Sequence, residues 1–409
     1  MGASRSLLVA ASAVGLVVRL AFGLGYWIDQ PLTRDEREYL SLARGLAAGR
    51  GFVYDAEVLS GPQDPFGRAP GYPAFLALVG GGRAVTSSVP ASVKVMQALV
   101  GAAGVILVGL LAGRLAGPRA GTIGAFVAAI YPPLVWVSAY AWSEAIAWPL
   151  GLLIVWSFDR AVWSGAPNAQ RHAAVAGALT GVAILIRPST LLFLPFALGW
   201  LAWRRRFILA IAMGAAAAVV VIPWSIRNTI EYGRFVGVAT EGGVTFWTGN
   251  HPRARGDGDL AANPHLKLES QALRRQHPER SEEAMEPVYY REALRWMRSH
   301  PIDWLRLEVR KVFYLIVPIG PSYTLHSARY YGASVISYGL ALPLAVAGFI
   351  RLGRRRSRTP GLWLLAGSAI ATCLIFFPQE RFRIPIIDPT LIICASAALV
   401  PLRESEPGR

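Results

Sequence analysis

The chain has 409 residues, of which 54% are hydrophobic and 16% charged, with 41 glycines and 13 tryptophans. Its mean hydropathy of +0.40 excludes an ordinary soluble protein and is typical of a polytopic membrane protein. The formal charge of +16 does not indicate nucleic-acid binding, because the basic residues form short clusters between apolar runs rather than one stripe. Cys373 and Cys394 lie inside apolar runs, which argues against a disulfide framework.

The first apolar run, residues 7–28, is predicted to be a membrane-spanning helix of the mature protein. About 20 apolar residues suffice to cross a bilayer. The run is too long for the apolar part of a signal peptide, and no convincing A-x-A cleavage site precedes the acidic segment that follows.

That acidic segment, PLTRDEREYLSLARGLAAG at residues 31–49, predicts a helix with Asp35 and Glu36 in its first turn. Thr33 and Glu36 match the capping-box pattern, which explains Glu36 without any further function. Asp35 stands four residues before Tyr39, on the face expected to pack inward. The residues alone leave two interpretations of Asp35 open, a helix cap and a catalytic carboxylate.

The rest of the chain is dominated by further apolar runs. The segment 70–82, PGYPAFLALVGGG, is short and rich in Gly and Pro, and predicts an interfacial or re-entrant helix rather than a span. About 20 apolar residues are needed for each crossing, so the first run and the later ones together predict about ten spans. The predicted spans are 7–28, 92–113, 120–141, 143–160, 173–187, 189–203, 207–225, 332–351, 361–378 and 384–402.

Basic residues in the short connections predict the orientation, because cytoplasmic loops carry the excess of Lys and Arg. With the N-terminus in the cytoplasm, all of these clusters fall on the cytoplasmic side: Arg5, Arg114 and Arg119, Arg160 and Arg171, Arg204–Arg206, Arg351 and Arg354–Arg358, and Arg403. Two large external loops result, residues 29–91 and 226–331. The predicted fold class is an all-α polytopic membrane protein in three parts: 1–225, which includes the first loop, then 226–331, and then 332–409.

The second large loop starts with a stretch dense in Gly, Asn and Asp that reads as turns, and continues with helical spacing. Tyr290, Leu294 and Met297 share one helical face, and Pro301 predicts a break before a second helix. Aromatic and Arg residues on such helices suit the membrane surface.

Charged residues gather at the predicted outer ends of the spans. They are Arg68, Glu144, Arg187, Arg227 beside Asn228, and then Glu380, Arg381 and Arg383. Each one alone is explained as an end-of-span charge. Together they indicate a functional site on the outer face, and arginine is suited to binding phosphate.

A metal site has less support. The six histidines are scattered, without a spacing that puts two of them on one helix face. His251 with Asp257 and Asp259 offers ligands for a divalent cation, but a solvated turn is the commoner explanation of such a segment. No required cofactor is predicted.

Five segments together carry a family resemblance, in order along almost the whole chain: RDEREYLSLARGLAAGRGF, RAPGYPAFLAL, LIRPSTLLFLP, IPWSIRNTIEYGRFVGVATEGGVTFWTGNHPRARG and ERFRIPIIDP. The chain resembles the bacterial family 39-type glycosyltransferases of the GT-C superfamily. Protein O-mannosyltransferases and aminoarabinose lipid A transferases are relatives of that family.

The resemblance implies a GT-C fold and an inverting hexosyl- or pentosyltransferase in the bacterial cytoplasmic membrane, with its active site facing outward. The implied donor is a polyprenyl-phosphate sugar, and the acceptor is a glycan, lipid or protein of the cell envelope. In such enzymes the Asp of the first-loop acidic motif, which matches Asp35, is taken as the base that deprotonates the acceptor hydroxyl. A phosphate leaving group needs charge stabilisation rather than a proton donor.

The other predicted site residues follow from this picture. The donor phosphate is assigned to Arg68, Arg227, Arg381 and Arg383, with Arg381 preferred because it lies beside an acidic residue. Glu36, Glu144 and Glu380 are the supporting acidic residues. Expected substrate contacts are Tyr39, Tyr72, Arg187, Asn228, Trp247 and Asn250, although Trp and Tyr also populate membrane interfaces for ordinary reasons.

Two alternatives belong to other classes of protein. A transporter or flippase of lipid-linked glycans predicts charges at mid-depth in the bilayer and inverted repeats. The sequence has no evident repeat of this kind, and its charges gather at the outer ends of spans. A scaffold that binds a cell-wall partner leaves the acidic pair and the arginines without a shared purpose.

Overall fold

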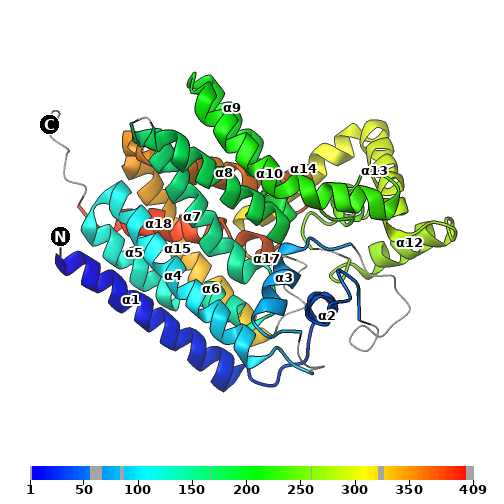
Figure 1. Cartoon of the computed structure of the whole chain (residues 1–409), viewed down its shortest axis with the longest axis horizontal. Coiled ribbons are helices and arrows are strands. Elements are labelled where there is room, and N and C mark those ends of the chain that lie inside the picture. Colours follow the sequence, from blue (N-terminus) through cyan, green and yellow to red (C-terminus); the bar gives the residue numbers. More distant parts are fainter. Residues whose placement is uncertain are drawn as a thin grey trace.

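The computed structural model describes residues 2–55, 67–82, 87–165, 167–258, 260–320 and 327–401. Within these ranges every regular element is a helix, as the predicted fold class requires (Figure 1). Six of the described helices are long and apolar enough to cross a membrane. They are α1 (Gly2–Ala21) with the π-helical turn η1 (Phe22–Tyr26), α4 (Ala91–Ala116), α7 (Glu144–Trp163), α8 (Asn168–Ile186), α10 (Phe207–Tyr232) and α15 (Ala328–Leu352) with η5 (Gly353–Arg358). The chain is a multi-pass membrane protein.

Three further predicted spans form apolar helices that are shorter. They are α9 (Phe193–Trp203), which follows η3 (Pro188–Leu192), then α16 (Pro360–Ile375) and α18 (Ile387–Ala398). Every predicted apolar run therefore contains helix, whereas the number of ten crossings stays a prediction.

The predicted span 120–141 is not one straight helix. The run forms α5 (Pro118–Ile130), followed after Tyr131 by α6 (Pro132–Trp136) and η2 (Val137–Ala139), with a bend of 61° at the break. Pro132 and Pro133 cause the break, because proline has no backbone N–H and its ring obstructs the preceding turn. Including this bent pair as one span raises the count to seven.

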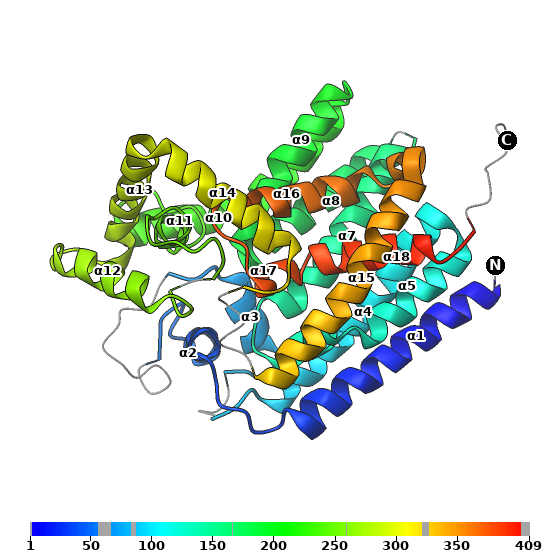
Figure 2. The same cartoon turned by 180° about the vertical axis from the view of Figure 1, so that it is seen from behind.

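The short elements gather at one end of the bundle. Here lie α2 (Arg34–Ala47), α3 (Gly71–Leu78), α11 (Gly242–Gly249), α12 (Pro264–Arg275), α13 (Glu282–Ser299), α14 (Pro301–Ile316) and α17 (Glu380–Arg383). Two opposite views show α2, α12 and α13 at this end, whereas α1 begins and α18 ends at the other (Figures 1 and 2). The short helix expected within 70–82 is α3, which packs against α2.

The two helices of the second long loop are separated at Pro301, as predicted. Tyr290 and Leu294 lie on the exposed side of α13. Its packed side consists of other residues, including Met285 and Tyr289, which pack with residues of α11 and α12 in a separate apolar cluster.

Candidate active site

The first turn of α2 is fixed by a capping box, as the sequence predicts. Thr33 Oγ1 accepts a hydrogen bond from the Glu36 amide at 3.4 Å, and the Thr33 amide donates to Glu36 Oε2 at 2.7 Å. The other carboxylate oxygen, Oε1, accepts from the Ala141 amide at 2.9 Å. Burial raises the pKa of Glu36. Glu36 therefore both caps α2 and ties it to the segment that leads into α7.

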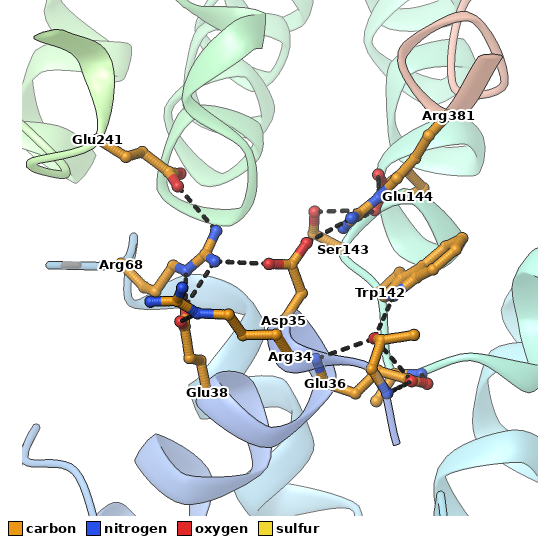
Figure 3. A network of polar contacts seen from close by, with 12 residues as sticks. Arg34, Asp35, Glu36, Glu38, Arg68, Trp142, Ser143, Glu144, Glu241 and Arg381 are labelled. Carbon is orange, nitrogen blue, oxygen red and sulfur yellow. Dashed lines mark hydrogen bonds and ion pairs between the residues drawn. The ribbon is translucent and has the colours of Figure 1, made fainter. Parts of the chain in front are cut away.

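Asp35 lies beside this cap, between two arginines from different parts of the chain (Figure 3). Its Oδ1 accepts a hydrogen bond from Arg68 Nη2 at 2.8 Å, and its Oδ2 accepts one from Arg381 Nη1. The Asp35 side chain is 28% exposed. A substrate can thus reach a carboxylate whose two oxygens are both held.

The two arginines determine the charge of Asp35. Burial acts to raise the pKa of Asp35, but the guanidinium groups of Arg68 and Arg381 outweigh it and hold that pKa well below its usual range. Asp35 is therefore ionised at neutral pH and, in this state, a weak base.

Arg68 is surrounded by carboxylates. It donates from Nε to Glu38 Oε2 and from Nη1 to Glu241 Oε2, each at 2.8 Å, besides its bond to Asp35. One face of the guanidinium lies over the Tyr39 ring, 5.2 Å from the centroid. Since Arg68 is buried and its donors are engaged, its role in this state is to hold Asp35 in place.

The two long loops are joined next to Arg68. The Gly67 amide donates to Thr240 Oγ1, and the Thr240 amide donates to the Gly67 carbonyl, each at 2.8 Å. This reciprocal pair brings Glu241, at the start of α11, against Arg68. A Cβ on residue 67 would lie only 2.8 Å from Thr240 Oγ1, so the close approach requires glycine.

On the other side of Asp35, one buried carboxylate holds two arginines. Glu144 accepts a hydrogen bond from Arg381 Nε and pairs with Arg187 Nη1 at 2.9 Å. Glu144 is fully buried, whereas the side chains of Arg187 and Arg381 are 12% and 21% exposed. Arg187, which precedes η3, and Arg381 of α17 thus form a cationic pair beside Asp35. Glu144, at the start of α7, bridges the two.

Aromatic rings support these arginines. The Arg381 guanidinium lies over the Trp142 ring at 4.3 Å from the centroid, and that of Arg187 lies over Phe382 at 5.3 Å. Tyr72 is fully buried behind Tyr39 and donates to Gln97 Oε1 at 2.7 Å. In the described structure Tyr72 therefore packs beneath the site.

The structure brings together about half of the predicted site residues. Those that meet around α2 are Asp35, Glu36, Tyr39, Arg68, Glu144, Arg187 and Arg381, with Tyr72 behind them. The other six, Arg227, Asn228, Trp247, Asn250, Glu380 and Arg383, make their contacts elsewhere.

Asn250 and Trp247 belong to the framework of the second loop. Asn250 Nδ2 donates to the carbonyls of Phe246 and Ile375, and its Oδ1 accepts from Trp304 and Lys311. The amide of Asn250 is thereby fully used. Trp247 is buried in the α11–α13 apolar cluster.

Arg227 and Asn228 lie near the end of α10. Arg227 stacks on Trp224 at 5.1 Å from the ring centroid, and its Nη2 lies 3.7 Å from the carboxylate of Glu231. Asn228 Nδ2 donates to the Val238 carbonyl at 3.3 Å, which fastens the chain that follows α10.

Glu380 and Arg383 form a second buried cluster at α17. Arg383 Nε donates to Asp388 Oδ1 at 2.8 Å and lies over the Tyr338 ring, whereas Glu380 accepts from the Ser334 hydroxyl. Burial raises the pKa of Glu380 to about 7. Arg381 points from the same short helix to Asp35, so neighbouring residues of α17 serve different clusters.

Sequence reasoning missed Glu38 and Glu241, which both contact Arg68. Glu38 stands three residues after Asp35, a spacing that puts both on one side of a helix, so the signal was available. Glu241 has no comparable local signal, since its place depends on the pairing of two distant loops.

No metal-binding group of three or more His, Cys, Asp or Glu side chains occurs within the residues that the structure describes. His251 Nε2 lies 3.1 Å from Glu269 Oε2. Asp259, the third residue of the candidate cation segment, lies outside the described residues.

This arrangement of apolar helices, with short helices at one end, has the GT-C fold. The model of the family "Dolichyl-phosphate-mannose-protein mannosyltransferase" matches residues 68–226. The expected GT-C fold is confirmed. A search of curated proteins returns no match.

Solved structures of an oligosaccharyltransferase support the fold. The oligosaccharyltransferase AglB from Archaeoglobus fulgidus, in complex with an inhibitory peptide and a dolichol-phosphate, matches at a TM-score of 0.54 and 15% identity, over 97% of this chain and 50% of AglB. Its apo form matches at a TM-score of 0.55 and 16% identity, over 97% and 50%. ArnT from Cupriavidus metallidurans, bound to undecaprenyl phosphate, matches at a TM-score of 0.43 and 14% identity, over 96% and 77%. The chain spans about half the length of AglB.

Proposed function

We propose that this protein is an inverting glycosyltransferase that moves a sugar from a polyprenyl-phosphate-linked donor to an acceptor, with Asp35 as the base. The observation that carries the proposal is the partly exposed carboxylate of Asp35, which faces the Glu144-bridged pair Arg187 and Arg381. The names of the matched family and of AglB bound to dolichol-phosphate support a lipid-phosphate donor.

In the proposed reaction, Asp35 removes a proton from the acceptor, and a cation on the other side of the site stabilises the leaving phosphate. Asp35 takes the proton of the acceptor hydroxyl while the acceptor oxygen attacks the anomeric carbon of the sugar. The bond from that carbon to the phosphate oxygen breaks, and the phosphate leaves with the electron pair. A cation that faces the leaving phosphate lowers the barrier, because negative charge develops there.

Among the predicted phosphate ligands, Arg381 is the best placed. It lies beside Asp35 and is partly exposed, and Arg187 is held next to it by Glu144. We assign Arg68 instead to positioning Asp35, because three carboxylates already occupy its donors. Arg227 and Arg383 have partners away from Asp35, which argues against both as phosphate ligands.

Donor binding also strengthens the base. With Arg381 on its Oδ2, Asp35 holds a proton poorly. When the donor phosphate takes the Arg381 guanidinium, Asp35 loses one of the two cations that lower its pKa, and its affinity for the acceptor proton rises. Arg381 thus links phosphate binding to proton transfer.

The proposed setting is the bacterial cytoplasmic membrane, with the N-terminus in the cytoplasm and the site facing outward, where acceptors of the cell envelope lie. The arginine-rich short connections support this orientation.

The test is transfer from a panel of radiolabelled polyprenyl-phosphate hexoses and pentoses to envelope fractions by the purified protein in nanodiscs. Asp35→Asn is expected to reduce transfer by about 10²- to 10⁴-fold, the usual contribution of a general base. Asp29→Asn is the matched control, because Asp29 is an exposed carboxylate of the same loop. Transfer by Asp35→Asn at the wild-type rate would contradict the assignment of the base. In a parallel assay in closed vesicles, movement of labelled lipid across the membrane with no covalent product on any fraction would instead favour a transporter.

A further inference from the structure

Arg19 is a buried cation in the middle of the apolar helices. It belongs to α1, inside the candidate span Arg5–Tyr26, and its side chain is among the largest that are fully buried. No carboxylate among the described residues forms an ion pair with it, since its hydrogen bonds go to backbone carbonyls. An ionisable group at such a site costs free energy and calls for a specific role.

The carbonyls that Arg19 binds identify this role. Its Nη1 donates to Ala129 O at 3.2 Å and to Gly15 O at 2.9 Å, and its Nη2 donates to Ala128 O at 3.3 Å. Ala128 and Ala129 belong to the last turn of α5, directly before the 61° break.

The break itself leaves these two carbonyls without their normal donors. In an α-helix the carbonyl of residue i accepts from the amide of residue i+4. The residues four positions after Ala128 and Ala129 are Pro132 and Pro133, which have no N–H. Backbone groups in an apolar environment require a replacement partner. The Arg19 guanidinium supplies it for both carbonyls.

The surroundings leave room for the guanidinium. A Cβ on Gly101 of α4 would lie 2.7 Å from Arg19 Nε, so glycine is needed there. The Trp148 ring of α7 lies on another side, 5.8 Å from the guanidinium carbon. Four helices therefore meet around this one side chain.

The break leads directly into the candidate active site. After α6 and η2 the chain reaches Ala141, whose amide binds Glu36, and then Trp142, on which Arg381 stacks. Gln97 holds the same segment through the carbonyls of Ser138 and Tyr140, at 2.9 and 2.8 Å. The direction of this segment depends on the bend that precedes it.

We infer that Arg19 is a positioning residue of the candidate active site: it stabilises the Pro132–Pro133 break and thereby sets Ala141 against Glu36 and Trp142 against Arg381. The effect on sugar transfer rests on the proposed function, whereas the effect on local structure does not.

The test is hydrogen exchange by mass spectrometry on the full-length protein in nanodiscs, followed in the peptide that covers residues 137–144. Arg19→Ala is expected to accelerate exchange there at least about tenfold, because two carbonyls lose a charge-assisted hydrogen bond and the loss of one alone corresponds to about tenfold. Arg19→Lys should remain within about threefold of wild type, because an ammonium has three donors for the same carbonyls. Ser12→Ala is the matched control, since Ser12 of α1 also donates to a backbone carbonyl, Ala102 O at 2.8 Å.

A triple variant separates positioning from stability. Arg19→Ala combined with Pro132→Ala and Pro133→Ala returns amide donors to Ala128 and Ala129. The melting temperature of the triple variant should return to near the wild-type value, while exchange in 137–144 stays fast and transfer stays slow, because the bend is lost. If Arg19→Ala does not fold, the triple and Arg19→Lys variants decide the question.

Wild-type exchange in residues 137–144 of Arg19→Ala, or full recovery of both exchange and transfer in the triple variant, would overturn the inference. If Asp35→Asn keeps the wild-type rate, the proposed base is wrong, but the hydrogen-exchange result for Arg19 still holds. The two proposals can therefore be refuted independently.

Discussion

Asp35 and Arg381 are 346 positions apart in the chain, yet Arg381 Nη1 donates a hydrogen bond to Asp35 Oδ2. The same guanidinium donates from Nε to the buried carboxylate of Glu144. Any change that moves Arg381 therefore also alters the charge environment of Asp35.

Glu144→Gln should destabilise the protein and slow transfer. The amide keeps the shape of the side chain but not its charge, so Arg187 and Arg381 lose their shared counter-ion and repel each other. Breaking a buried ion pair in this way costs about 3 kcal/mol, which is measured as a lower free energy of unfolding in detergent. Glu231→Gln is the control, because that carboxylate is 59% exposed and pairs with Arg227 across 3.7 Å. Equal losses in the two variants would contradict the bridging role of Glu144.

The pH dependence of sugar transfer should show how far the arginines lower the pKa of Asp35. The pKa of Asp35 is held well below its usual range, so the wild type should lose no transfer to Asp35 protonation above about pH 4. Arg68→Ala removes one of the two cations, and the acidic limb of kcat/KM should then move upward by about one pH unit or more. Arg37→Ala is the control, because Arg37 is an exposed arginine of the same helix. If the acidic limb of kcat/KM in Arg68→Ala stays where it is in the wild type, Arg68 does not lower the pKa of Asp35.

Glu380 should make stability fall as the pH rises. Burial raises its pKa to about 7, so between about pH 4 and pH 7 the folded state binds a proton that the unfolded state has released. The charged and polar groups around it are Arg383, Asp388, Asp257 and Ser334. Glu380→Gln removes the titration, and is expected to raise the melting temperature at pH 8 and to leave it nearly unchanged at pH 5. The exposed carboxylate of Glu279 provides the control variant Glu279→Gln. The same melting-temperature change at both pH values would exclude the titration of Glu380 as its source.

Gly67→Ala should disturb the junction of the two long loops. The added methyl group would lie 2.8 Å from Thr240 Oγ1, and such overpacking costs about 1–3 kcal/mol. Combining it with Thr240→Ala removes two of the three nearest atoms and leaves the Tyr232 hydroxyl at 3.1 Å, so a double-mutant cycle should show a favourable coupling. Gly237→Ala is the matched control, because a Cβ there meets no atom within 4 Å. Strict additivity of the two losses would argue against contact between these residues.

Much of the local structure follows from the sequence, because it depends on neighbouring residues. The Thr33–Glu36 capping box, the apolar helices and the interruption at Pro301 arise from backbone hydrogen bonding and hydrophobicity within a few turns. The bend after α5 had the same kind of signal in Pro132 and Pro133, which the prediction of the span 120–141 did not use.

The partners of each charge were decided by the tertiary structure. An arginine at the end of a span has the same local pattern whether it meets Asp35, as Arg68 and Arg381 do, or Asp388, as Arg383 does. The difference arises from the direction in which distant helices approach one another.

By itself the sequence determined a polytopic all-α protein with a capped acidic helix after the first span. Only the tertiary structure decided that Asp35 is held between Arg68 and Arg381. It also decided that Glu241 binds the first of these arginines and Glu144 the second. The physical reason is the separation along the chain of the residues that interact. Caps and helices are stabilised by contacts within one turn, whereas ion pairs form only after helix packing has brought side chains from separate parts of the chain within hydrogen-bonding distance.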